Sequence, residues 1–246
     1  MPFDPDWILP QWQAPPCVKA VITTRAGGFS SGPYASLNLG LRTGDDAAAV
    51  ARNRARLRSI LPQEPKWLRQ VHGSAAVSAD TISASAPEAD ASVARSPGTV
   101  CAVLIADCVP VLLSNRAGSV VAAAHAGWRG LAHGVIERTL AATGEEPGEL
   151  LAYLGPGIGP DAFEVGAEVR ETFLTQAPQD ADAFSPHASG KWLANLFTLA
   201  RNRLQRAGLR MIFGGGICTY SDPARFFSYR RDRTTGRMAA LIWREA

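Results

Sequence analysis

Excess charge and long apolar runs are both scarce in this 246-residue chain. Lysine and arginine number 25 against 22 aspartate and glutamate residues, and the arginines are dispersed along the chain. The sequence therefore offers no basic stripe for a nucleic acid. No apolar run approaches the ~18–20 residues of a membrane-spanning helix, and the first residues lack the basic and apolar segments of a secretory signal. We expect a cytoplasmic monomer that binds neither nucleic acid nor membrane.

Cysteine and histidine are rare, with four residues of each type. The cysteines are Cys17, Cys101, Cys108 and Cys218, which lie far apart and form no Cys-x-x-Cys pair. In a cytoplasmic protein this pattern indicates free thiols or metal ligands rather than a disulfide framework. The hydrophobic content of 46% and the charged content of 19% are those of an ordinary globular chain.

Strand and helix patterns alternate along the chain, which indicates an α/β fold with a mixed sheet, and the length suits one domain over residues 1–246. Apolar and β-branched runs predict strands at 18–24, 65–72, 99–105, 109–113, 119–124, 149–154 and 209–216. Amphipathic spacing predicts helices over 47–61, 131–144, 163–174 and 191–208. We expect a closing hairpin of 226–232 with 237–243, and a surface excursion at 78–98.

Three potential metal ligands, His72, Cys108 and His125, each stand where an apolar strand gives way to a loop. They are 36 and 17 residues apart, so three separate elements would have to converge. Catalytic zinc sites use three protein ligands and leave a fourth position open. The pattern predicts an open Zn²⁺ site, which Cu²⁺ could also occupy because it binds nitrogen and sulfur ligands more tightly.

Two other interpretations of these residues stay open. A histidine at a strand end is commonly an ordinary polar residue, and Cys108 by itself would be a core cysteine. Alternatively, Cys108 is a catalytic nucleophile with His125 or His72 as its base. A nucleophile and one base use only two of the three residues and leave the placement of the other histidine unexplained.

The segment HAGWRG, residues 125–130, continues from the third of these residues. Its glycines leave room for a ligand to approach, Trp128 offers a stacking face, and Arg129 is suited to a phosphate or carboxylate. Arg25 and Arg230 are further candidates for binding an anion. Core packing of the tryptophan and solvation or ion pairing of the arginines are the structural alternatives.

Six motifs in series resemble those of the laccase-domain family. They are TTRAGGFSSGPYASLNLG, WLRQVHG, ADC-x-P, HAGWRG, LGPGIGP with FEVGAEV, and CTYSDPARFFSYRRDRTTGRMA. The resemblance runs from about Pro10 to Trp243, which is essentially the whole chain. Bacterial members of the family are called polyphenol oxidases, purine nucleoside phosphorylases or peptidoglycan editing factors.

The resemblance implies a single-domain, four-layer α/β/β/α sandwich with mixed sheets, similar to the cysteine hydrolases typified by cytotoxic necrotizing factor. It implies zinc held by His72, Cys108 and His125. It also implies phosphorolysis of adenosine, inosine and methylthioadenosine, with deamination of adenosine as a second activity. Some members are linked to removal of misincorporated amino acids from peptidoglycan, which implies an amidase acting on a UDP-muramyl-peptide precursor. Many relatives carry cysteines where this chain has residues 160–163, so we expect no redox role for that loop.

Copper chemistry of the laccase type is excluded by the histidine content. A trinuclear copper cluster is bound largely by imidazoles, several of them in His-x-His pairs. This chain has four histidines and no such pair. We therefore expect a single Lewis-acidic ion rather than a copper cluster.

For deamination, the metal would lower the pKa of an attacking water toward ~7. The zinc-deaminase signature H-x-E…P-C-x-x-C is missing from the sequence, so the acid/base group must come from elsewhere. Glu164, Asp107 and Asp90 are the candidates, and the cysteine-hydrolase alternative makes Cys108 itself catalytic.

For phosphorolysis, an arginine among Arg25, Arg129 and Arg230 would hold phosphate near the ribose C1′. Asn38 and Asn53 are candidates for hydrogen bonds to the substrate, with a turn and a solvated helix position as their structural alternatives. Three function classes follow: a metal-dependent purine nucleoside enzyme, an amidase on a cell-wall precursor, and a non-enzymatic protein that binds a metal or docks a partner.

Overall fold

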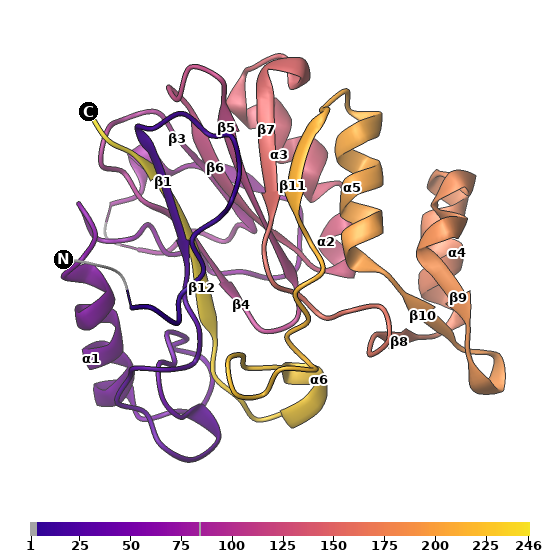
Figure 1. Ribbon diagram of the computed structural model, residues 1–246, viewed down its shortest axis with the longest axis horizontal. Coiled ribbons are helices and arrows are strands. Elements are labelled where there is room, and N and C mark those ends of the chain that lie inside the picture. Colours follow the sequence, from indigo (N-terminus) through magenta and orange to yellow (C-terminus); the bar gives the residue numbers. More distant parts are fainter. Residues whose placement is uncertain (1–3, 84) are drawn as a thin grey trace.

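Three β-sheets organise the computed structural model, which describes residues 4–83 and 85–246. The first sheet contains β1 (Val18–Ile22), β12 (Met238–Arg244) and β4 (Cys101–Ile105), and both strand pairs are antiparallel. Its strands come from the beginning, the end and the middle of the chain. The sheet therefore joins the two ends of the sequence side by side (Figure 1).

The closing hairpin predicted for 226–232 and 237–243 is wrong in its first half. Residues Tyr229–Asp232 form the short helix α6, and β12 pairs with β1 and β4 instead. The hydroxyl of Ser228 caps this helix by accepting the N–H of Arg231 at 3.2 Å. The local cap therefore overrides the strand pattern of the sequence.

A six-stranded sheet has the order β11–β7–β5–β6–β3–β2. Its strands are β2 (Ala76–Ser78), β3 (Ala91–Ala94), β5 (Val109–Asn115), β6 (Val121–Ala126), β7 (Leu150–Leu154) and β11 (Met211–Gly214). The outer pairs β11–β7 and β2–β3 are parallel, and the inner pairs are antiparallel. This arrangement confirms the predicted α/β class with a mixed sheet.

Two segments before β4 differ from the prediction. Residues 78–98 include β3, which is buried along its whole length and lies between β6 and β2, so this segment is not only a surface excursion. Its small side chains suit close packing inside the sheet. Residues 65–72 make isolated bridges at Lys66 and Arg69 rather than a continuous strand.

The third sheet, of β8 (Glu164–Val165), β10 (Trp192–Ala194) and β9 (Phe184–Pro186), was not predicted. Strands β8 and β10 occupy the first residues of two predicted helices. The helices themselves, α4 (Ala167–Gln176) and α5 (Leu196–Arg206), therefore begin later than their amphipathic patterns suggested.

Two further helical regions complete the fold. Helix α1 (Ala47–Arg58) is capped by the carboxylate of Asp46, which accepts two backbone N–H groups of the first turn. The single helix predicted over 131–144 is in fact α2 (Trp128–Ala132) and α3 (Val135–Thr143), because Gly134 takes a left-handed φ of +83° between them. No helix in the described part of the chain has the length and apolarity needed to span a membrane.

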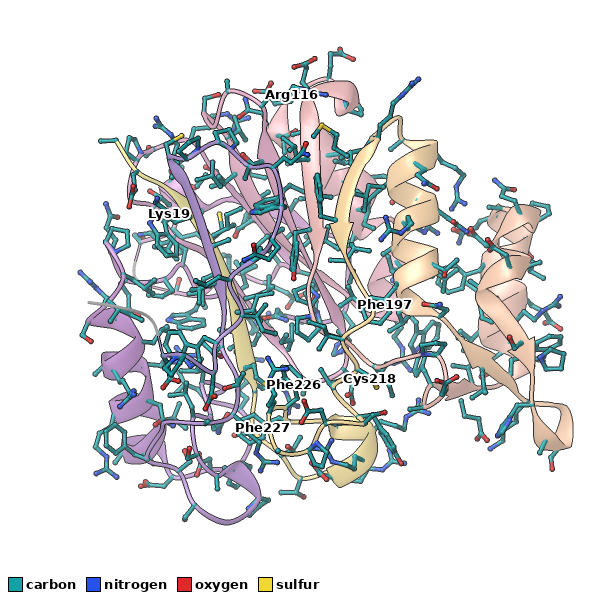
Figure 2. All side chains as sticks on the ribbon, in the orientation of Figure 1. Lys19, Arg116, Phe197, Cys218, Phe226 and Phe227 are labelled. Carbon is teal, nitrogen blue, oxygen red and sulfur yellow. The ribbon has the colours of Figure 1, made fainter. Side chains whose placement is uncertain are left out.

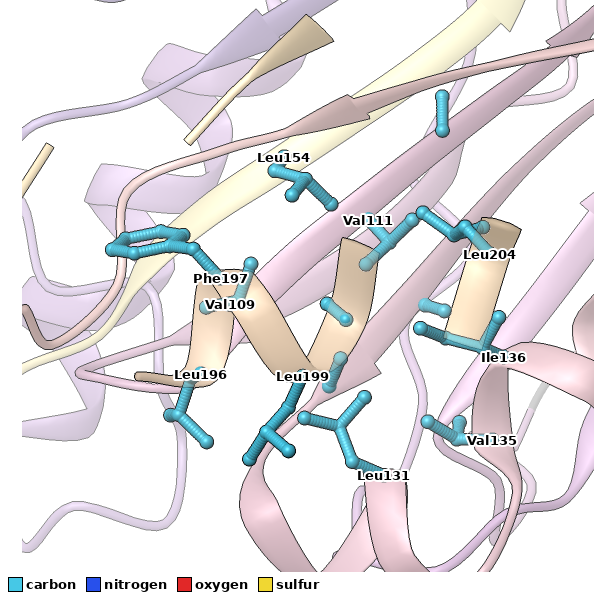
Figure 3. Packing of buried hydrophobic residues seen from close by; sticks show 14 of the residues in the cluster. Val109, Val111, Leu131, Val135, Ile136, Leu154, Leu196, Phe197, Leu199 and Leu204 are labelled. Carbon is cyan, nitrogen blue, oxygen red and sulfur yellow. The ribbon is translucent and has the colours of Figure 1, made fainter. Parts of the chain in front are cut away.

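Three buried clusters separate these elements into layers. The first packs α2, α3, α4 and α5 against one face of the six-stranded sheet, and its members include Leu199 of α5, Ile136 of α3 and Val111 of β5 (Figure 3). The second fills the space between the six-stranded and three-stranded sheets. The third packs α1 against the outer face of the three-stranded sheet through residues such as Leu57. Helices α1 and α5 accordingly lie on opposite sides of the sheets (Figure 1).

Candidate metal centre and adjoining cavity

Cys108 stands where the chain passes from the three-stranded sheet into the six-stranded sheet, between β4 and β5. In this turn Asp107 takes a φ of +92°. Its carboxylate accepts the hydroxyl of Thr219 at 2.7 Å and the backbone N–H of Arg230 at 2.7 Å. The C-terminal part of the chain therefore fixes the turn that presents the thiol.

His125 lies on β6, opposite Pro110 of β5 in the antiparallel register. Residues i, i+2 and i+4 of a strand line the same face, so His125 shares a face with Val121 and Ala123, which pack between the six-stranded sheet and the β1–β12–β4 sheet. Its side chain is almost completely buried. Because β5 begins one residue after Cys108, the pairing of β5 with β6 brings the histidine beside the thiol.

Asp90 joins the two histidines. Its fully buried carboxylate accepts the backbone N–H groups of Val71, His72 and Gly73 at 3.1, 3.0 and 2.7 Å. The same carboxylate lies 2.9 Å from the Nδ1 of His125. His72 has a left-handed φ of +61°, so the backbone curls around this carboxylate. Since Asp90 directly precedes β3 and β3 pairs with β6, the sheet itself places this anchor.

His72, Cys108 and His125 form a compact cluster whose potential ligand atoms all lie within 4.8 Å of one another. Burial opposes ionisation of the thiol, but the charge and hydrogen bonding of His125 and the contact with His72 lower the pKa of Cys108 to about 6. Burial likewise opposes charging of His125, yet Cys108 and Asp90 raise its pKa to about 9. The cluster therefore stabilises a thiolate beside an imidazolium.

The donor set of this cluster fits a zinc ion. Thiolate sulfur and imidazole nitrogen are the usual zinc ligands, and catalytic sites use three of them. The contact of His125 Nδ1 with Asp90 leaves Nε2 as the free ring nitrogen, which is the carboxylate–histidine arrangement common at metal sites. Among residues 4–83 and 85–246, these three form the one group of histidine, cysteine or acidic side chains placed to share an ion.

The position of Gly127, two residues after His125, requires a residue without a side chain. A Cβ at this position would lie 2.6 Å from the Sγ of Cys108 and 3.5 Å from the ring of His72. A side chain here would therefore displace the thiol. This glycine of HAGWRG therefore makes room for the Cys108 thiol, whereas the sequence analysis expected the glycines to make room for a ligand.

Replacing Gly127 by alanine is expected to weaken zinc binding at least about tenfold and to destabilise the fold by about 1–3 kcal/mol, because the new methyl group crowds Cys108. Zinc titration and urea unfolding of the purified variant measure these effects. Gly148→Ala is the matched control, since a Cβ there meets no atom within 4 Å. Unchanged zinc affinity in the Gly127 variant would contradict the tight placement of the thiol.

A cavity of about 710 Å³ adjoins the cluster, and all three of its residues line it. This volume is typical of sites for small molecules. Aromatic side chains on its wall are Trp67, Trp128, Phe163 and Tyr229. Arginine side chains on its wall are Arg42, Arg54, Arg129, Arg230, Arg233 and Arg237. The cavity thus combines planar stacking faces with strong positive charge.

Three of the predicted site residues outside the cluster line this cavity: Asp107, Arg129 and Arg230. Arg230 donates from its guanidinium to the backbone carbonyl of Glu164 at 2.6 Å. The carboxylate of Glu164 is bound instead by Lys191 at 2.5 Å, which holds the pKa of Glu164 below its usual value, and it is not part of the lining. Glu164, predicted as an acid/base candidate, therefore touches the cavity residue Arg230 through its backbone carbonyl, which accepts the hydrogen bond.

Three other predicted residues lie outside the cavity lining and stabilise the loop that leads to it. Arg25 donates to the carbonyl of Ala35 at 2.8 Å. Asn38 and Asn53 are fully buried. The side-chain oxygen of Asn38 accepts the backbone N–H of Arg237 at 2.8 Å. The side-chain amide of Asn53 donates to the backbone carbonyl of Asn38 at 2.8 Å. Their side-chain hydrogen bonds are made to the protein itself.

Four cavity arginines were missed by the sequence analysis: Arg42, Arg54, Arg233 and Arg237. They come from a loop, helix α1 and the segment before β12, so no local spacing joins them. The one available signal is the arginine-rich stretch RRDRTTGR, residues 230–237, and its pattern predicts a hairpin rather than a cavity wall. Only the fold shows that they share a wall with Arg54.

Residues 19–245 match the family described as multi-copper polyphenol oxidoreductase laccase. The chain belongs to this family. A protein of Escherichia coli K12 named purine nucleoside phosphorylase YfiH is 52% identical over 238 residues, covering 96% of this chain and 98% of its own. The Pseudomonas aeruginosa purine nucleoside phosphorylase PA4543 is 50% identical over the same shares of both chains. These matches confirm the resemblance inferred from the six motifs.

Solved structures show the same fold. The crystal structure of Neisseria meningitidis protein NMB0706 matches with a TM-score of 0.95 at 49% identity, over 98% of this chain and 100% of that one. YlmD from Geobacillus stearothermophilus matches with a TM-score of 0.87 at 31% identity, over 94% and 93%. The α/β architecture described above is therefore that of the family.

The multi-copper description of the family does not agree with the ligands of this chain. Of its four histidines, only His72 and His125 belong to the cluster. His133 ends helix α2, and His187 lies 3.6 Å from Glu164. Two imidazoles and one thiolate suit a single ion rather than a trinuclear copper centre.

Proposed function

We propose that this protein is a metal-dependent purine nucleoside phosphorylase. The observation that carries the proposal is one cavity in which the His72–Cys108–His125 cluster adjoins arginine and aromatic side chains. A purine can stack on the aromatic faces, and guanidinium groups are suited to phosphate. The names of the relatives that are 52% and 50% identical support the same activity.

Phosphorolysis breaks the bond between the purine nitrogen and the ribose C1′, forms a bond from a phosphate oxygen to C1′, and transfers the proton of hydrogen phosphate to the departing base. We assign Arg129 and Arg230 to the phosphate, because guanidinium groups bind phosphate oxygens with paired hydrogen bonds. Arg230 is held by the Phe163 ring, 5.0 Å away, and by its bond to the carbonyl of Glu164. Asp107 positions this arginine by accepting its backbone N–H.

We further propose that the resident ion is Zn²⁺, with Cu²⁺ able to occupy the same ligands. When bound, the ion supplies Lewis acidity, which polarises a substrate atom or lowers the pKa of water. The proposed substrates are adenosine, inosine and methylthioadenosine, and adenosine deamination is the second proposed activity. In deamination a water oxygen replaces the amino group at C6, which leaves as ammonia. Asp90 keeps both histidines oriented in either reaction.

A thiol hydrolase that cleaves an amide, for example in a muramyl-peptide precursor, is the second candidate. Cys108, His125 and Asp90 lie in the order of nucleophile, base and orienting carboxylate, which favours it. The thiolate would attack the amide carbonyl, His125 would give its proton to the departing amine, and water would then release the acyl group from sulfur. The two candidates use the same residues and differ in their need for metal.

Removal of metal by a chelator is expected to lower adenosine phosphorolysis by more than about 100-fold, and one equivalent of zinc should restore it. The measurement is formation of adenine and ribose 1-phosphate before and after reconstitution. A thiol hydrolase would instead survive chelation and be inactivated by an alkylating reagent. Undiminished phosphorolysis by the metal-free protein would rule out the proposed metal dependence.

A further inference from the structure

The cavity holds more positive charge than the protein itself neutralises. None of its six arginines has a carboxylate oxygen within 4.0 Å among residues 4–83 and 85–246. Elsewhere such ion pairs are made by Arg56, Arg69, Arg116, Arg203, Arg206, Arg225 and Arg231. Asp107 is the one carboxylate in the lining, and both of its oxygens already accept hydrogen bonds. The other negative charge there is the Cys108 thiolate, which interacts with His125 and His72.

This charge is maintained although the fold disfavours it. Burial lowers the pKa of Arg54 to about 10, with Glu64 acting in the opposite direction. Burial also lowers the pKa of Arg237, although the charges of Cys108 and Asp107 act in the opposite direction. A charged group removed from water destabilises a fold unless its counter-charges offset the burial. Their presence in one cavity therefore points to a ligand that brings the missing negative charge.

Three of the six arginines share neighbours. Arg54 and Arg237 both form a hydrogen bond with the backbone of Leu39. The Nε of Arg54 donates to the carbonyl of Leu39 at 2.9 Å, and the backbone N–H of Leu39 donates to the carbonyl of Arg237 at 3.0 Å. Arg233 and Arg237 both lie 5.9 Å from the centroid of the Tyr229 ring. These shared neighbours place Arg54, Arg233 and Arg237 on one wall.

Arg42 belongs to the same wall, because it lies on the loop that continues from Leu39 through Gly40, whose Cβ position meets Arg237. The remaining two arginines, Arg129 and Arg230, are the pair assigned above to the phosphate that attacks C1′. The wall formed by Arg42, Arg54, Arg233 and Arg237, called the second arginine group below, has no assigned ligand.

We infer that the cavity binds a purine nucleoside 5′-phosphate, with the second arginine group holding the phosphate of the nucleotide. The inference rests on the proposed function for the nucleoside part of the ligand. A nucleoside is neutral, and a guanidinium group binds phosphate oxygens with two parallel hydrogen bonds, so Arg129 and Arg230 can hold one inorganic phosphate. The 5′ position is the end of the sugar remote from the glycosidic bond, so an anion there can use a separate set of arginines.

Calorimetric titration of the wild-type protein with adenosine, AMP, ADP and inorganic diphosphate tests this inference. AMP is expected to bind at least about tenfold more tightly than adenosine. This ratio of affinities should fall when the salt concentration is raised from about 50 to about 200 mM, because salt screens the attraction between the phosphate and the arginines. Equal or weaker binding of AMP would overturn the inference. Inorganic diphosphate binding as tightly as ADP would also overturn it, by indicating a site for free anions.

Variants of the second arginine group test whether it holds the 5′-phosphate of the nucleotide. The double variant Arg42→Ala and Arg233→Ala is expected to lower the ratio of AMP affinity to adenosine affinity at least about tenfold. Arg116→Ala is the matched control, because Arg116 is exposed, pairs with Glu149 and lies at the opposite end of the molecule from Phe226 and Phe227, which lead into α6 (Figure 2). An unchanged ratio in the folded double variant would contradict the assignment. If the double variant does not fold, the wild-type titration decides alone.

The same titrations separate this inference from the proposed function. Tight AMP binding without phosphate-dependent cleavage of adenosine would retain the nucleotide site and reject the phosphorylase. Cleavage of adenosine with no preference for AMP would retain the phosphorylase and reject the second arginine group as a phosphate site.

Discussion

Replacing Cys108 by alanine is expected to abolish stoichiometric zinc binding and to lower adenosine turnover by more than about 100-fold. Loss of a group that merely orients a metal ligand costs about 10–100-fold in affinity or activity, so loss of a ligand should cost more. The effect should be large here because only three ligand atoms converge, all within 4.8 Å of one another. Zinc content of the purified variant and its rate of adenine formation are the two measurements.

Cys17→Ala is the matched control for the Cys108 variant. Cys17 is a half-buried free thiol like Cys108, but its sulfur lies near the carbonyl of Gly118, away from the cluster. This control should keep its zinc and its activity. Full zinc content together with normal adenosine turnover in Cys108→Ala would reject the role of Cys108 as a metal ligand.

Replacing Asp90 by alanine is expected to reduce the free energy of unfolding by about 3–5 kcal/mol, the usual cost of removing one partner from a buried charge pair. The change leaves the N–H groups of Val71, His72 and Gly73 without their acceptor and removes the partner of His125. Asp90→Asn keeps one acceptor oxygen and should lose less stability. It should still weaken zinc binding about 10–100-fold, because His125 loses its charged partner.

Asp80→Asn controls for the loss of a carboxylate that caps backbone groups. Asp80 accepts the N–H groups of Arg95 and Ser96 at 2.9 and 3.2 Å, outside the metal cluster. We expect this variant to lose some stability and no zinc affinity. If Asp90→Asn and Asp80→Asn bound zinc equally well, Asp90 would be a structural residue without influence on the metal ligands.

The sequence predicted the cluster because its three residues share a recognisable placement at strand ends. Their convergence depends on the pairing of β5 with β6 and of β3 with β6, which no single segment encodes. Asp90 stays a predicted acid/base candidate. The structure adds that its carboxylate is fully buried and contacts the backbone of His72 and the ring of His125, which no sequence pattern indicated.

Sequence patterns did not predict four of the arginine side chains that line the cavity. Arg54 lies in the helix predicted over 47–61, and Arg233 and Arg237 lie in or beside the predicted hairpin, so neither pattern marks them as neighbours. They become neighbours because β12 inserts between β1 and β4, which brings the end of the chain beside its beginning. The hydrogen bond from Arg231 to the Ser228 side chain caps helix α6, which forms where the sequence pattern predicted a strand.

Phosphate-dependent cleavage of adenosine by freshly purified protein of known metal content tests the central claim most directly. We predict adenine and ribose 1-phosphate in equal amounts only when phosphate is present, from protein that carries about one equivalent of zinc, as a three-ligand catalytic site would. Absence of ribose 1-phosphate from the fully zinc-loaded protein, with adenosine left intact, would contradict it.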